Sequence, residues 1–250
     1  MPQQVFTHTF PNGLTLLAER MEHVRSATMY LLVPSGYTHD PAGQDGMSTL
    51  MCEMLVRGAG DRDSKKLLLD LDNLGADRGE SVGPFNLVLS AGTLARNLPA
   101  VLDIYADVIR RPHLPADELE AAQELALQDI QGLEDSPQEK VILELKSRYY
   151  PTPLNRNRYG TAAGVQAVTA KSLKAHHAAR FRANGAIFSV AGNIDWPSLK
   201  EQVGRLFGDW TGGASEPPTP GVHVPKSEHI TKDTQQTQIA IAVPSAPFAD

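Results

Sequence analysis

Short apolar stretches separated by turn residues predict that the chain begins with β-structure. The tripeptide PNG at residues 11–13 lies between apolar residues 6–10 and 14–19. An Asn-Gly pair between two such stretches is the strongest short-range signal for a β-hairpin. Residues 27–33, ATMYLLV, form an apolar run of the length of a buried strand. The chain is therefore expected to open as antiparallel sheet.

Residues 46–60, GMSTLMCEMLVRGAG, predict an amphipathic helix that ends in a glycine turn. Thr49 and Glu53 lie one helical turn apart on one face, with Cys52 beside them. Zinc peptidases place two histidines and a glutamate on one helix with this spacing. The helix therefore has the residue spacing of a metal site, but these positions do not carry the residue types that such a site uses there. Its other face is an apolar stripe of the kind that packs on a core: Met47, Leu50, Met51, Met54 and Leu55.

The next segments carry ordinary start and stop signals. A leucine-rich helix is predicted over residues 65–74, because Gly75 follows at the position where helices commonly end. Two β-like segments, residues 76–82 and 85–91, are separated by Gly83-Pro84. Neither is expected to be a central strand, since proline cannot donate a ladder hydrogen bond.

Three helices are predicted between residues 97 and 149. Asn97 is a candidate N-cap for the first, which stops at Pro112. The second begins after Pro115, and its apolar stripe includes a carboxylate, Asp129. A sharp corner follows, because residues 136–139, Ser-Pro-Gln-Glu, have the pattern of a capping box that starts a third helix. The stripe of the second helix contains Leu119, Ala122, Ala126, Ile130 and Leu133.

The rest of the chain predicts the end of one domain and the start of another. A helix over residues 169–181, a strand over 186–191 and a last amphipathic helix complete an α+β domain over residues 1–210, in which an antiparallel sheet is backed by helices. Residues 211–225 contain four prolines and three glycines and predict a linker. Residues 226–250 would begin a second, incomplete domain, with one strand at 237–243 and nothing for it to pair with.

Composition limits the functional classes. The chain has 250 residues, 41% of them hydrophobic, and a net charge of −6. Scattered basic residues and an acidic balance argue against nucleic-acid binding. One cysteine rules out an intrachain disulfide, and no apolar run is long enough to span a membrane. Without a visible signal peptide, we expect a soluble protein of a reducing compartment, the cytoplasm.

An ordered set of motifs resembles the insulinase/pitrilysin family of inverzincin metallopeptidases, to which the mitochondrial processing peptidases belong. The resemblance covers about residues 5–210. It implies the α+β domain described above, normally followed by a second domain of the same fold. The matching features are the helix entry Gly46-Met47 with Met54-Leu55 and Gly58, the Gly75 stop, Glu134-Asp135-Ser136-Pro137, Tyr159-Gly160, and the strand end Ala191-Gly192-Asn193-Ile194-Asp195.

The same resemblance implies that the catalytic centre is degenerate. Active members carry His-x-x-Glu-His on the helix that corresponds to residues 46–60. The first histidine falls on Thr49, the general-base glutamate on Cys52, and the second histidine on Glu53. The third zinc ligand, a glutamate of a later helix, falls on Asp129. A catalytic zinc needs about three protein ligands and a base for its bound water, so we expect no zinc in this chain.

The expected function is that of a catalytically silent homologue. Such members of the family pair with an active, zinc-containing peptidase subunit and help to enclose extended peptides. We therefore expect a hetero-oligomer with a structural and substrate-binding role, and contact with neither nucleic acid nor membrane. Two alternatives remain: an active peptidase with unorthodox ligands such as Glu53 and Asp129, or a stand-alone module that binds peptides at a sheet edge.

Each candidate residue also has a purely structural interpretation. Glu53 would be a hydrogen-bonded polar remnant, and Asp129 a partly buried carboxylate paired with a basic residue. Cys52 would be a small packing residue, since nothing nearby in the sequence could serve as its base. Neighbouring helix residues point about 100° apart, so His176 and His177 do not form a chelating pair. These interpretations are favoured over dedicated metal or thiol sites.

Overall fold

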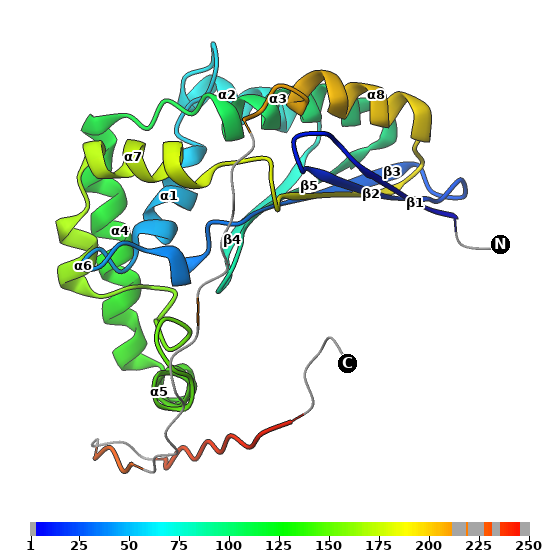
Figure 1. Cartoon of the computed structure of the whole chain (residues 1–250). Coiled ribbons are helices and arrows are strands. Elements are labelled where there is room, and N and C mark those ends of the chain that lie inside the picture. The colour runs from blue at the N-terminus through cyan, green and yellow to red at the C-terminus, as the bar shows by residue number, and fades with distance from the viewer. Residues whose placement is uncertain (1–3, 212–218, 220–227, 232–235, 246–250) are drawn as a thin grey trace.

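A six-stranded sheet with helices packed over one face forms the body of the molecule (Figure 1). The computed structural model describes residues 4–211, 219, 228–231 and 236–245. In spatial order the strands are β1 (Gln4–Thr9), β2 (Thr15–Arg20), β6 (Ile187–Gly192), β3 (Ser26–Val33), β5 (Leu87–Leu94) and β4 (Asp77–Val82). The predicted α+β fold is confirmed.

The sheet is antiparallel except at one pair. β1 and β2 form the predicted hairpin, with Thr9 opposite Thr15. β6 enters between β2 and β3, parallel to β2 and antiparallel to β3. The late strand β6 therefore joins the two early ones, which are not hydrogen-bonded to each other. The side chain of Asn12 in the hairpin turn donates hydrogen bonds to the carbonyl oxygens of Phe207, at 2.6 Å, and Trp210, at 3.1 Å.

Helices α3 and α8 pack beside each other over the sheet, and α1 lies between the sheet and α4 (Figure 1). The described part of the chain contains eight α-helices: α1 (Met47–Leu55), α2 (Ser64–Asn73), α3 (Leu98–Arg110), α4 (Leu119–Gly132), α5 (Pro137–Tyr149), α6 (Ala162–Ala167), α7 (Ala170–Arg180) and α8 (Trp196–Phe207).

The core lies between the helices and the inner face of the sheet. Burial alternates along β3, where every second side chain is buried, as expected for a sheet covered on one side. The predicted apolar stripe of α1 is confirmed, since all five of its residues are at most 1% exposed. Burial of this stripe fixes the rotation of α1 about its axis, and this rotation determines which residues face away from the core.

Two predictions about the strands and helices differ from the structure. β5 is an internal strand, paired with β3 on one side and β4 on the other, contrary to the expectation that neither segment is central. Gly83-Pro84 lies in the turn between β4 and β5, so the missing proline N–H falls outside both ladders. Helix α6 was not predicted, because its six residues are too short for a periodic signal.

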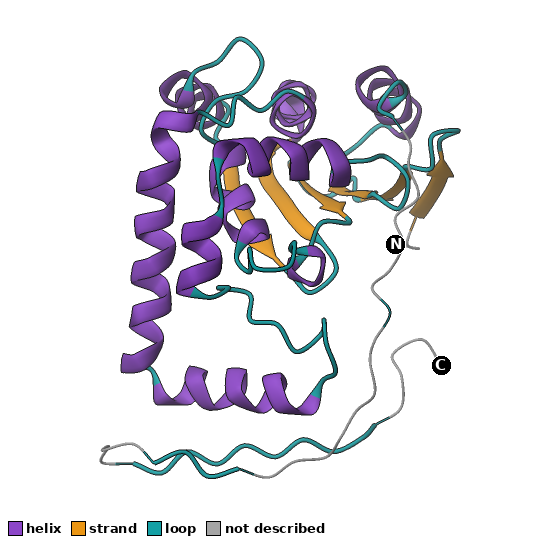
Figure 2. Cartoon of the chain, turned by 60° about the vertical axis from the view of Figure 1, so that its left-hand side comes forward, coloured by secondary structure: helices purple, strands orange, loops and turns teal. Residues whose placement is uncertain are grey.

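The corner between α4 and α5 is confirmed, but its predicted capping box is wrong (Figure 2). Ser136 is the N-cap residue of α5 without a side-chain capping hydrogen bond. The Glu139 carboxylate instead accepts hydrogen bonds from the Tyr159 hydroxyl, at 2.8 Å, and from Arg158, at 3.0 Å. Glu139 therefore binds two residues that are distant in the sequence instead of the backbone N–H of Ser136. Asn97 likewise does not cap α3, and its amide donates to the Leu74 carbonyl at 3.0 Å.

The predicted linker and most of the predicted second domain lie outside the described residues. Residues 236–245, which are described, contain no strand, so the strand expected at 237–243 is not formed here. Ile239 and Ile241 are 81% and 82% exposed, respectively. The division into residues 1–210, 211–225 and 226–250 stays a prediction. None of the helices in the described ranges is both long and apolar enough to cross a membrane.

Candidate functional site

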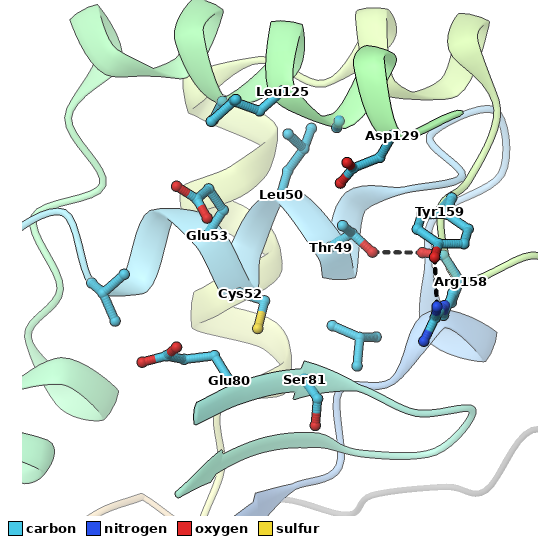
Figure 3. Close-up of a pocket in the computed structure, with 14 residues that line it drawn as sticks. Thr49, Leu50, Cys52, Glu53, Glu80, Ser81, Leu125, Asp129, Arg158 and Tyr159 are labelled. Atoms are coloured by element: carbon cyan, nitrogen blue, oxygen red, sulfur yellow. Dashed lines mark hydrogen bonds between the residues drawn. The ribbon is translucent and has the colours of Figure 1, made fainter. Parts of the chain in front are cut away.

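A pocket of about 330 Å³ lies between α1, α4, β4 and the loop that precedes α6 (Figure 3). All four positions singled out from the sequence, Thr49, Cys52, Glu53 and Asp129, line it. Residues 49–53 and residue 129 are far apart in the chain, so the fold brings them together. Apolar residues of α1, α4 and β4 form the rest of the wall, among them Leu50, Val56, Val82, Ala122, Leu125 and Ala126.

The start of α1 is held by a buried carboxylate that the sequence analysis missed. Asp40 is 5% exposed, and its oxygens accept from the N–H groups of Gly46, at 2.7 Å, and Ser48, at 2.9 Å. The Ser48 hydroxyl donates to the same carboxylate at 2.5 Å. Burial raises the pKa of Asp40, while these hydrogen bonds and Arg156 oppose that rise. Asp40 lies six residues before the N-cap residue Gly46, too far for a capping pattern to reveal it.

Thr49, which the sequence resemblance aligns with the first histidine of the motif, is engaged with the protein backbone. Its hydroxyl donates a 2.5 Å hydrogen bond to the carbonyl oxygen of Arg158, drawn as a dashed line in Figure 3. A threonine hydroxyl is a weak zinc ligand at neutral pH, and this one already has an acceptor. The contact joins α1 to the loop before α6.

Cys52, which the sequence resemblance aligns with the general base, carries a protonated thiol at neutral pH. The residue is 8% exposed and points toward β4 (Figure 3). Burial raises the pKa of Cys52 to about 12, and the negative charges of Glu80 and Glu53 contribute to the rise. A thiol in this state neither binds metal readily nor accepts a proton from water. The packing interpretation fits this environment.

Glu53, which the sequence resemblance aligns with the second histidine, is paired with a basic neighbour. Its carboxylate accepts from Arg57 Nη2 at 2.9 Å, four residues along the chain and just past the end of α1. Arg57 is largely buried and also binds Glu118 Oε2, at 3.1 Å through Nη1. The arrangement links α1 to the start of α4 and neutralises the Glu53 carboxylate. Arg57 could have been anticipated, because an i,i+4 glutamate–arginine pair is a recognised helix pattern.

Asp129 is exposed, which corrects the prediction of a partly buried carboxylate with a basic partner. It points from α4 toward Thr49 in Figure 3, at the rim of the pocket. No ion pair joins it to a basic side chain of the described ranges. The stripe of α4 is buried only at Leu119, Ala122 and Ala126. Beyond Ala126, Ile130 is only partly buried against the core and Asp129 lines the pocket, so helical periodicity overestimated the burial of this face.

Glu80 brings a further carboxylate to the pocket, from β4. Burial raises the pKa of Glu80, the charge of Glu53 adds to the rise, and Arg78 opposes it. Arg78 Nη1 lies 3.6 Å from Glu80 Oε1, which is farther than a hydrogen bond. The sequence analysis missed Glu80, because nothing in a strand of alternating polarity marks which residue faces a distant helix.

Metal-ligating groups and histidines complete the description of the site. No group of three or more His, Cys, Asp or Glu residues is arranged to hold a metal ion within the part of the chain that the structure describes. His176 lies outside the pocket, 5% exposed, with Nε2 3.1 Å from Ser35 Oγ. His177 Nε2 lies 2.8 Å from the carbonyl oxygen of Ile109. The two rings have separate partners, as expected for neighbours on a helix.

Comparison with known sequences identifies the family. Residues 15–162 match the family model described as insulinase (peptidase family M16), and residues 167–250 match the model described as the peptidase M16 inactive domain. The chain belongs to the insulinase family, M16. The resemblance seen in the sequence motifs is thereby confirmed.

Relatives of this M16 chain include proteins named as proteases. An uncharacterised zinc protease of Rickettsia felis is 24% identical over 238 residues, which cover 95% of this chain and 58% of the relative. The mitochondrial-processing peptidase subunit beta of Saccharomyces cerevisiae is 23% identical over 223 residues, covering 89% of this chain and 45% of that protein. The chain therefore spans about half the length of these relatives.

Solved structures share the fold of this M16 chain. A peptidase M16 inactive domain from Pseudomonas fluorescens superposes with a TM-score of 0.79 at 22% identity, covering 87% of this chain and 54% of that one. Pitrilysin superposes with a TM-score of 0.78 at 18% identity, covering 90% of this chain and 24% of that one. At these identities the likeness concerns the fold alone.

Proposed function

We propose that this M16 chain is a catalytically silent homologue of a zinc metallopeptidase, acting as the structural and substrate-binding partner of an active peptidase subunit. One observation carries the proposal. The four family positions face a common pocket, yet two of them, Thr49 and Glu53, bind other parts of the protein, and a third, Cys52, is a buried thiol. The fourth, Asp129, is a single exposed carboxylate.

The chemistry of peptide hydrolysis explains why these residues favour silence. Zinc-assisted hydrolysis requires an open coordination site, a bound water of lowered pKa and a carboxylate that takes its proton. Replacing the general base by Cys52 removes the proton acceptor, since a thiol whose pKa lies near 12 stays protonated at neutral pH. Zinc, in this proposal, belongs to the active partner.

The substrate-binding role is supported by the wall of the pocket. β4 is an edge strand, and its residues Glu80, Ser81 and Val82 line the same pocket as α1. A free strand edge offers backbone donors and acceptors to an extended peptide, and the adjoining pocket offers space for a side chain. Two half-chambers, one from this chain and one from the active partner, would enclose the peptide between them.

A peptidase assay of the purified chain tests the proposal against the active-enzyme alternative. We expect no cleavage of a library of unstructured peptides, with or without added zinc. Cleavage that is lost in Glu53→Ala and in Asp129→Ala would instead establish unorthodox ligands. Co-expression with an M16 relative that has an intact His-x-x-Glu-His motif should yield a complex, and cleavage that needs both chains.

A stand-alone peptide-binding module is the second candidate, favoured by the same β4 edge. It differs from the first candidate in its oligomeric state. Light scattering coupled to gel filtration should detect a monomer that binds an unstructured peptide without a partner. Such a result would support the module and remove the need for an active subunit.

A further inference from the structure

The segment between β3 and α1, residues 34–46, is held in place by polar contacts. Apart from Pro34, its buried side chains are polar, namely Ser35, Thr38 and Asp40. The N–H groups of residues 36, 37 and 38 donate to carbonyl oxygens of the β4–β5 turn at 3.0–3.1 Å. No large apolar side chain of this β3–α1 connection is fully buried, although Pro34 is. Segments that bury little apolar surface open at lower free energy than the core.

The β3–α1 connection in turn supports the loop that carries pocket residues. Arg156 donates to the carbonyl oxygens of Thr38, at 3.2 Å, and Asp40, at 2.6 Å. It also forms an ion pair with Asp45 at 3.3 Å. Arg156 belongs to the pocket loop, residues 150–161, which contributes Arg158 and Tyr159 to the pocket wall. Release of the connection would therefore free one wall of the pocket.

His176 of α7 fastens the start of this connection. Its Nε2 lies 3.1 Å from the hydroxyl of Ser35, which is completely buried. The ring is itself 5% exposed, so water cannot solvate a charge placed on it without movement. The contact is compatible with a neutral ring, in which one nitrogen accepts and the other donates.

The surroundings of the ring oppose its protonation. The charged and titratable groups that act on it are Arg180 and His177 of α7 and His39 of the β3–α1 connection, all of them basic. Burial lowers the pKa of His176 from 6.5 to about 4, and the three basic groups contribute in the same direction. When the connection opens, the ring meets water and regains its ordinary affinity for protons.

We propose that His176 is an acid-sensitive latch: as a neutral ring it keeps the β3–α1 connection closed, and its protonation releases this connection together with the pocket loop. The released ring binds a proton below pH 6.5, whereas the closed ring resists until about pH 4. Through His176, acid between these values favours release and neutral pH favours closure, whereas the raised pKa of Asp40 in the same connection acts in the opposite direction. This inference concerns regulation of the pocket, and it holds whether or not the chain is a silent subunit.

Hydrogen exchange followed by mass spectrometry measures the release directly. Exchange rates of the full chain, corrected for the intrinsic effect of pH, are compared at about pH 7.5 and about pH 5. Peptides that cover residues 34–46 and 150–161 should exchange roughly 30-fold faster at the lower pH, the ratio set by pKa values of 6.5 and about 4. Peptides from β3 and β6 should stay protected.

Three variants decide whether His176 is responsible. His176→Gln keeps a polar side chain that cannot titrate and should abolish the acid-dependent step. Arg180→Gln removes a cation that acts on the ring, so the step should shrink. Arg182→Gln is the matched control, because Arg182 acts on His177 and is not among the groups that act on His176. It should leave the step unchanged.

Each contrary outcome overturns the latch. Equal loss of protection in β3, β6 and the β3–α1 connection would mean acid unfolding of the whole domain. A flat pH profile in the wild-type chain would mean that the connection is not released. If His176→Gln fails to fold, Arg180→Gln decides alone, and an undiminished step in that variant contradicts the proposal.

Discussion

The two sides of α1 differ in what determines their residues. The side toward the sheet is apolar and completely buried, with Met47, Met51 and Leu55 at 0% exposure. The side toward the pocket carries Thr49, Cys52 and Glu53, and each of these meets a group from a distant part of the chain or from a neighbouring turn. Packing of the side toward the sheet requires only that apolar residues of suitable volume recur with the helical period. The properties of the second side depend on partners that periodicity does not reveal.

Under the proposed function, this contrast explains how the framework of a metallopeptidase site would persist without its chemistry. The apolar stripe docks α1 and aims residues 49, 52 and 53 at the pocket, while Asp40 holds the start of the helix. Replacement of those three residues leaves the docking intact, because none of them contributes a large side chain to the core. Residues 49, 52 and 53 are therefore distinct from the apolar residues that dock the helix.

The largest expected effect lies on the core side. Leu55→Ala should lower the free energy of unfolding by about 2–5 kcal/mol, because it leaves a cavity in a completely buried environment. Leu125→Ala is the matched change on the pocket side, where the residue is 50% exposed, and should cost about 0.5 kcal/mol. Urea denaturation measures both. Equal costs would show that the pocket wall is packed like the core.

An intermediate effect is expected where α1 begins. Asp40→Ala removes the acceptor of two backbone N–H groups and of the Ser48 hydroxyl, and should cost roughly 1–2 kcal/mol of unfolding free energy. Asp117→Ala, at an exposed position, serves as the control and should change little. Thermal denaturation can compare the two. A neutral Asp40→Ala would indicate that burial of the apolar stripe alone fixes the start of the helix.

The smallest effect on the free energy of unfolding is expected at Thr49. Thr49→Val preserves shape but removes the hydrogen bond to the Arg158 carbonyl, at a cost of about 0.5–1.5 kcal/mol. The loop before α6 should exchange its amide hydrogens faster in this variant, and Thr28→Val on β3 is the control. If the loop exchanges as in the wild type, the hydroxyl does not tie it to α1.

Local patterns predicted those parts of the fold that local interactions determine. The hairpin at Asn12, the strand β3 and the stripe of α1 follow from turn chemistry and periodicity. The internal place of β5 and the parallel pairing of β2 with β6 depend on contacts between segments far apart in sequence. No local pattern encodes such contacts.

The candidate site was predicted as a set of positions, and its interactions were not. Family resemblance singled out Thr49, Cys52, Glu53 and Asp129, and all four line the pocket. The capping box predicted at Ser136 did not form, because the Glu139 side chain binds Arg158 and Tyr159 instead. The buried carboxylate of Asp40 and the strand residue Glu80 were not predicted, since Asp40 lies too far before α1 for a capping pattern and Glu80 lies on a strand that is distant from α1 in the sequence.

Zinc content is the most direct test of the central claim, that α1 retains the framework of a metallopeptidase site without its chemistry. The purified chain is equilibrated with zinc, freed of unbound metal and analysed by plasma mass spectrometry. Its positive control replaces Thr49→His, Cys52→Glu, Glu53→His and Asp129→Glu together, which restores the ligands and should give about one zinc ion per chain. The account predicts no stoichiometric zinc in the wild-type chain. One tightly held zinc ion per wild-type chain, lost in Glu53→Ala, would contradict it.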